Sequence, residues 1–89
     1  MISQTTTIIN KLGLHARAAA KFVNQASLFD SEIYLKRNGR EVNGKSIMGV
    51  MMLAAAKDSE IELIINGDDE KQAMQSLIEL IANRFGEAS

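Results

Sequence analysis

Two hydrophobic periodicities alternate along the chain. From Glu32 to Arg37 and from Glu60 to Asn66, apolar and polar residues alternate one by one, the period of a strand with one buried face. The segment from Ile2 to Ile9 is rich in Thr and Ile, which favour strands. From Ala16 to Ser27, apolar residues recur at spacings of three and four, which predicts an amphipathic helix.

Turn signals divide the rest of the chain into short elements. Asn38-Gly39 is a strong hairpin signal, because both central residues of a type I′ turn need positive φ, and it predicts a return strand from Arg40 to Asn43. A compact apolar stretch from Ile47 to Ala56 predicts a second helix. The acids of Gly67-Asp68-Asp69-Glu70 open a last helix at its positive end, and Gly86 is expected to stop it.

These elements follow one another in the order βαββαβα. The order predicts an α+β fold, a two-layer open-faced sandwich with a four-stranded, mainly antiparallel sheet and three helices on one face. A ferredoxin-like arrangement with an extra helix is equally compatible with it. The apolar faces predict these core positions: Ala16, Ala19, Ala20, Val23, Ala26, Ile33, Leu35, Val50, Leu53, Ile61, Leu63, Ile65, Ala73, Met74, Leu77, Ile78, Ile81 and Phe85.

Composition narrows the possible functions. With 89 residues, the chain is expected to form a single domain over residues 1–89. It has no Cys and one His, so we expect no disulfide, no thiol nucleophile, no metal centre and no cofactor. A net charge of −1 argues against nucleic-acid binding. No apolar run approaches the roughly 20 residues of a membrane span, and no signal peptide is recognisable, so the expected location is the cytoplasm without membrane insertion.

The single histidine, His15, stands just before the predicted first helix. The first N–H groups of a helix lack internal partners and carry the positive end of its dipole, so they favour anions. A phosphate on the ring could turn back onto the backbone N–H groups of Ala16 and Arg17, and the Arg17 guanidinium matches phosphate oxygens. Neutral imidazole is a competent nucleophile. A His before a helix is more often a polar loop residue, so the residues alone give a candidate anion site.

Two motifs at a fixed separation carry a resemblance. Asn10-Lys11-Leu12-Gly13-Leu14-His15-Ala16-Arg17 resembles the active-site stretch of the HPr family, the histidine phosphocarriers of the bacterial phosphotransferase system. The segment Asn43-Gly44-Lys45-Ser46-Ile47-Met48-Gly49-Val50-Met51-Met52-Leu53 is similar to the second signature of that family. The length and the βαββαβα order match over nearly the whole chain.

The resemblance implies a carrier function. Enzyme I, phosphorylated by phosphoenolpyruvate, would pass the phosphoryl group to Nδ1 of His15, and His15 would pass it to an EIIA-type protein. Arg17 would hold phosphate oxygens during both transfers. The chain would then be a monomeric phosphoryl carrier and not a turnover enzyme. Both the sugar-linked and the nitrogen-linked branch of the system are compatible with the sequence.

Ser46 and the apolar residues after it are the second candidate region. The Ser46 hydroxyl suits a helix N-cap. In many HPr proteins the matching Ser is phosphorylated by HPr kinase/phosphorylase with ATP, so a cap and a regulatory site are both open interpretations. The resemblance also implies an exposed patch of Ile47, Met48 and Met51 near His15 that docks enzyme I, EIIA proteins and the kinase.

One residue departs from the family motif. The family usually reads His-x-Arg-Pro, whereas this chain has Ala18 and no Pro anywhere. Ala is a good helix former, so we expect the geometry at the start of the helix to survive. The alternative from another class is a small α+β binding or hydrolytic domain, such as an acylphosphatase-like enzyme with an Arg–Asn pair. That alternative leaves His15 and the Ser46 segment unexplained.

Overall fold

The strands form one antiparallel sheet whose order differs from their order along the chain. The computed structural model describes residues 1–89. The sheet order is β1-β4-β2-β3, and every neighbouring pair is antiparallel. In the register, Ile65 lies between Ile2 on one side and Ile33 on the other. The strands are β1 (Ile2–Thr7), β2 (Glu32–Arg37), β3 (Arg40–Asn43) and β4 (Glu60–Asn66).

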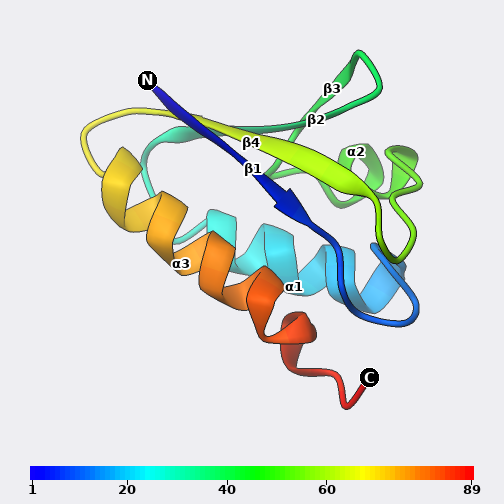
Figure 1. Ribbon diagram of the computed structural model, residues 1–89. Coiled ribbons are helices and arrows are strands. Elements are labelled where there is room, and N and C mark those ends of the chain that lie inside the picture. Colours follow the sequence, from blue (N-terminus) through cyan, green and yellow to red (C-terminus); the bar gives the residue numbers. More distant parts are fainter.

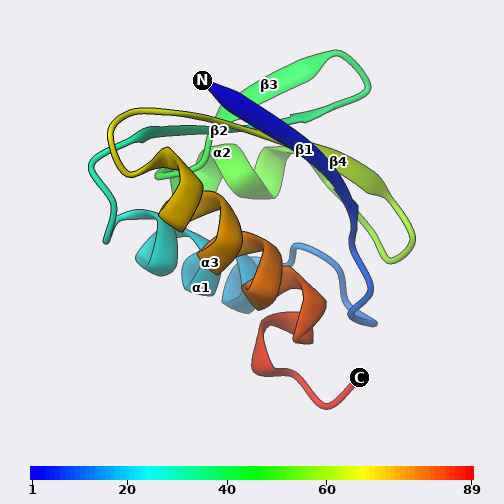
Figure 2. The ribbon, with the colours of Figure 1, turned by 60° about the vertical axis from the view of Figure 1, so that its left-hand side comes forward.

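The helices cover one face of this sheet. They are α1 (Ala16–Ala26), α2 (Ile47–Met52) and α3 (Glu70–Ala82), and α3 is followed by a short 3-10 turn, η1 (Arg84–Gly86). Figures 1 and 2 show α1 and α3 side by side beneath the sheet, while its other face is left open. The predicted α+β two-layer sandwich is confirmed. None of the helices combines the length and the apolar character that crossing a bilayer requires.

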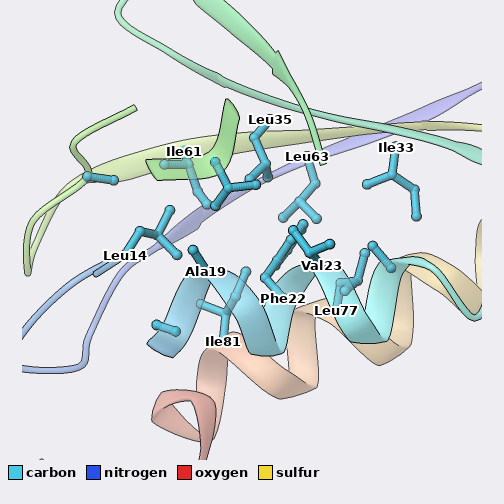
Figure 3. Close-up of a cluster of buried hydrophobic side chains, with 14 of the residues drawn as sticks. Leu14, Ala19, Phe22, Val23, Ile33, Leu35, Ile61, Leu63, Leu77 and Ile81 are labelled. Atoms are coloured by element: carbon cyan, nitrogen blue, oxygen red, sulfur yellow. The ribbon is translucent and has the colours of Figure 1, made fainter. Parts of the chain in front are cut away.

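The hydrophobic core fills the space between the sheet and the helices (Figure 3). The alternating residues of β2 and β4 point into it as predicted. Burying each of these large aliphatic side chains contributes roughly 1.5–3 kcal/mol to folding. The buried apolar residues are Ile8, Leu14, Ala18, Ala19, Phe22, Val23, Ala26, Ile33, Leu35, Val50, Leu53, Ala55, Ile61, Leu63, Ile65, Ala73, Met74, Leu77, Ile81 and Phe85.

The buried face of α1 differs from the predicted one. Ala16 is exposed and Ala20 is half-buried, whereas Ala18 and Phe22 are fully buried. Residues four apart share a helix face, so Ala18 and Phe22 turn inward together. Burying the Phe22 ring removes far more apolar surface from water than burying Ala16 does. The large side chain therefore determines how α1 is rotated against the sheet.

The second helix is shorter than its apolar stretch predicts. We expected a helix as far as Ala56, but α2 ends at Met52. The guanidinium of Arg37 donates to the Leu53 carbonyl at 3.1 Å, and that of Arg40 donates to the Met52 carbonyl at 3.1 Å. These side chains from the β2–β3 hairpin satisfy carbonyls that a continuing helix would use. Ala54 then takes a left-handed φ of 52°.

Other element ends also differ from the prediction. β1 ends at Thr7 and not at Ile9, because the backbone of Ile8 pairs with Asp58 and Ser59 in the loop before β4. The first helix ends one residue earlier than expected, at Ala26.

The last helix ends well before the predicted stop. α3 ends at Ala82, before Gly86, and Phe85 is buried from η1. Ile78 is only half-buried. The predicted hairpin turn is confirmed, with φ of 52° at Asn38 and 81° at Gly39.

Candidate functional site

His15 is the N-cap residue of α1. Its backbone is extended (φ −72°, ψ 178°), and its carbonyl accepts the Ala19 N–H at 2.8 Å. The ring makes no capping hydrogen bond to the helix. The first-turn N–H groups of Ala16, Arg17 and Ala18 donate to no loop or side-chain acceptor, and the geometry of a helix gives them no internal partner. The site therefore presents unpaired donors beside an imidazole, as the sequence predicts.

The loop before His15 is held in place on both sides. The Leu14 N–H donates to the Ala55 carbonyl at 2.9 Å, just beyond α2, and the Leu14 side chain is buried in the core (Figure 3). Gly13 has a φ of 67°. The Asn10 side chain donates to the Gly13 carbonyl at 2.8 Å. Because these bonds fix the residues before it, His15 has a defined position at the start of the helix.

The structure brings one residue to His15 that the sequence did not indicate. Glu87, 72 positions later, has its Oε2 at 2.5 Å from Nε2 of His15. Its Oε1 accepts from the Asn10 side-chain amide at 3.0 Å. The His15 and Glu87 side chains are 28% and 13% exposed. Figures 1 and 2 show how the C-terminal segment, in red, leaves α3 at the end of the molecule where α1 begins.

The protonation of this pair follows from its geometry. Burial opposes ionisation of Glu87, but the hydrogen bonds from Asn10 and His15 outweigh it and hold the Glu87 pKa below its ordinary value. An ionised carboxylate is only an acceptor, so the ring must donate from Nε2. A neutral ring then has its lone pair on Nδ1, which forms no hydrogen bond within the chain. No local motif could have shown this, because the pairing depends on the path of the chain after α3.

Positive side chains outnumber negative ones around the ring. The Arg17 guanidinium is exposed and forms no ion pair. Arg17, Lys11 and Lys21 line the cleft beside His15 together with one acidic side chain, Glu87, and this excess of positive side chains favours an anion there. The cleft is lined by Lys11, Leu12, His15, Ala16, Arg17, Lys21, Gly86, Glu87, Ala88 and Ser89.

Ser46 is the N-cap of α2, as predicted. Its hydroxyl oxygen accepts the Gly49 N–H at 3.1 Å, and its carbonyl accepts the Val50 N–H at 2.9 Å. Val50 is fully buried and Leu53 nearly so, which confirms both as core residues.

The apolar side chains on the outer side of α2 face away from the core. Ile47, Met48 and Met51 are 42%, 71% and 38% exposed, and Met52 is 58% exposed. The predicted patch is thus exposed, and the Leu14–Ala55 hydrogen bond ties the end of α2 to the loop that carries His15.

Comparisons with known proteins show which family the chain belongs to. The family model described as the PTS HPr component phosphorylation site matches residues 2–83. The phosphocarrier protein HPr of Cupriavidus necator is 59% identical over 87 residues, which cover 98% of each chain. The crystal structure of HPr-C-His from Thermoanaerobacter tengcongensis aligns over the full length of both chains with a TM-score of 0.96 and 45% identity. An HPr dimer from the same organism aligns over 98% of this chain and 100% of that one, with a TM-score of 0.79 and 46% identity. The chain therefore belongs to the HPr family, the phosphocarrier proteins of the phosphotransferase system.

Proposed function

We propose that His15 receives a phosphoryl group on Nδ1 from enzyme I and passes it to an EIIA-type protein. The observation that carries this proposal is the placement of an unpaired imidazole nitrogen beside the unpaired N–H groups of Ala16 and Arg17. A phosphoryl group on Nδ1 carries negative charge to the positive end of α1, where the helix dipole stabilises it. The free guanidinium of Arg17 supplies forked donors for its oxygens.

The arrangement supports a carrier and not a turnover enzyme. Phosphoryl transfer depends mainly on positioning and on charge stabilisation, and the cleft at His15 offers both. The ring is partly exposed, so a donor protein and then an acceptor protein can approach it in turn. On this proposal the chain is one domain over residues 1–89 that works as a monomer in the cytoplasm.

A reconstituted transfer chain tests the proposal. Purified enzyme I, phosphoenolpyruvate and an EIIA protein are incubated with the chain, and the label is followed from phosphoenolpyruvate to EIIA. We expect EIIA to be labelled only when the chain is present, and the His15→Ala variant to block transfer. Labelling of EIIA through His15→Ala would overturn the assignment.

We further propose that Ser46 is a phosphorylation site for HPr kinase/phosphorylase. A phosphate there would replace a capping hydroxyl at the start of α2, where negative charge is favourable. It would also place that charge beside Ile47 and Met48, and so weaken docking of an acidic partner. Incubation with the kinase and ATP should add an acid-stable phosphate that Ser46→Ala lacks. An unchanged mass of the wild-type chain would contradict the proposal.

The exposed residues Ile47, Met48 and Met51 form the proposed docking patch for enzyme I, EIIA proteins and the kinase. Flexible Met side chains repack easily, which suits a surface that meets several partners. The chain would use the same patch for its donor and its acceptor, because both must reach His15.

A further inference from the structure

We propose that Glu87 is a positioning residue for phosphoryl transfer, which keeps the ring proton of His15 on Nε2 so that Nδ1 presents its lone pair. The inference rests on the proposed role of His15 as phosphoryl acceptor and adds a residue to it. Glu87 lies outside the residues 2–83 that match the family model.

The hydrogen bonds around Glu87 require a carboxylate. One of its oxygens faces Nε2 of His15 at 2.5 Å, and the other faces the Asn10 amide nitrogen at 3.0 Å. Both neighbours are donors, and a carboxylate can accept from both. A Gln side chain could accept from only one of them, because its second terminal atom is itself a donor. When the ring proton of His15 is on Nε2, the pair of contacts therefore selects a carboxylate over an amide.

The buried Asn10 side chain holds this carboxylate. Its side chain is fully buried, and its amide nitrogen donates to both the Gly13 carbonyl and Glu87. Its amide oxygen has no partner. Burying an unpaired polar atom costs folding free energy. This cost accompanies an orientation in which the Asn10 amide nitrogen donates to Glu87 and to the loop of His15.

The backbone after α3 is bent to bring Glu87 to the site. Arg84 and Phe85 both have a φ of 55°, a left-handed conformation that non-glycine residues adopt only when their surroundings impose it. The Phe85 side chain is fully buried, and its carbonyl accepts from Nζ of Lys21 at 2.7 Å. The anchored Phe85 reverses the chain, and the carboxylate two residues later reaches His15.

The ring proton of His15 stays in place when the phosphoryl group is transferred. The lone pair on Nδ1 of His15 forms the new N–P bond, the bond from phosphorus to the donor atom of phosphorylated enzyme I breaks, and its electron pair stays on that donor atom. The ring of His15 becomes positive and keeps its proton on Nε2, where the Glu87 carboxylate stabilises the charge. In the second transfer a lone pair of the EIIA-type acceptor forms the new bond to phosphorus, the N–P bond at His15 breaks, and its electron pair returns to Nδ1.

Substitutions at Glu87 test this role on the intact chain. Glu87→Gln and Glu87→Ala are compared with Glu41→Gln, which removes an exposed carboxylate from β3. Nitrogen-15 NMR of the unphosphorylated ring should show a slowly exchanging, downfield proton on Nε2 in the wild type and in Glu41→Gln. Both Glu87 variants should lose this signal, and Glu87→Gln should increase the Nδ1–H tautomer. The single-turnover rate of phosphorylation by phosphorylated enzyme I should fall at least about tenfold in both Glu87 variants, measured at a temperature at which circular dichroism shows every variant to be folded.

The two readouts separate this inference from the proposed function. Wild-type ring signals and wild-type rates in Glu87→Ala would refute the role of Glu87 while leaving His15 as the acceptor. If the wild-type chain takes no phosphoryl group from enzyme I, the proposed function fails, and the role of Glu87 in transfer fails with it.

Discussion

The tightest backbone approach in the candidate site is at Gly13, and replacing this residue by Ala should test how the His15 loop is built. A Cβ at Gly13 would lie 2.5 Å from the carbonyl oxygen of Ala55 and 2.9 Å from Cα of Ala56. Both are backbone atoms and cannot rotate away. The same carbonyl accepts the Leu14 N–H, so moving it disturbs the bond that ties the end of α2 to the loop.

Gly39 is the control, because Ala there must also adopt a left-handed backbone but meets no steric overlap. Gly13 and Gly39 have φ of 67° and 81°, so the left-handed backbone costs Ala about 1–2 kcal/mol of unfolding free energy at either position. No atom lies within 4 Å of a Cβ at Gly39. At Gly13 the overlap adds about 1–3 kcal/mol, as for an overpacked core. Gly13→Ala should therefore lose about 2–5 kcal/mol of unfolding free energy, against about 1–2 kcal/mol for Gly39→Ala.

Urea unfolding followed by circular dichroism measures both variants. The extra loss should also lower the melting temperature of Gly13→Ala by about 4–24 °C relative to Gly39→Ala, at about 4–8 °C per kcal/mol. The rate of phosphorylation by enzyme I should fall in Gly13→Ala and stay unchanged in Gly39→Ala. Equal losses of stability in the two variants would show that the close approach to Ala55 does not hold the loop.

Substitutions at four further positions test other parts of the structure. Ser46→Ala should cost about 0.5–2 kcal/mol in urea unfolding, while Ser46→Asp, which keeps a capping oxygen, should stay close to wild type; equal losses would contradict the capping role. Met48→Glu should weaken binding of enzyme I in calorimetry without lowering the melting temperature, and unchanged affinity would remove Met48 from the docking patch. Ala18→Pro should change the phosphorylation rate by less than about tenfold, because the N–H that it removes is unpaired. A larger gain would contradict the expectation that Ala18 preserves the geometry at the start of α1. Hydrogen bonds from the Ser31 hydroxyl and from backbone N–H groups hold the Asp69 pKa below its ordinary value of 3.8. The wild type should therefore have a larger free energy of unfolding than Asp69→Asn at neutral pH, and this difference should vanish as the pH falls below 3.8. A difference that persists in acid would contradict this linkage.

The sequence predicted the elements that have strong local signals. The alternation in β2 and β4, the turn at Asn38-Gly39 and the cap at Ser46 each depend on a few adjacent residues, and each agrees with the structure. The same holds for His15 at the start of α1, where the change from a loop to a helical period is visible in the chain.

The features that the sequence did not predict depend on contacts between distant residues. The end of α2 is set by Arg37 and Arg40 from the β2–β3 hairpin, which no pattern inside the helix reveals. The face of α1 is set by how the Phe22 ring fits between the layers, which a pattern based on small residues overlooks. Glu87 reaches the site only because the chain reverses at Phe85, and that residue was expected to continue the last helix.

The intact mass of the chain after incubation with enzyme I and phosphoenolpyruvate shows whether His15 is the phosphoryl acceptor. The chain has a single His, so a phosphohistidine can form at only one position. We expect the mass of one added phosphoryl group, which is lost in acid, stable in alkali and absent from His15→Ala. An unchanged mass, or an added group that persists in His15→Ala, would contradict it.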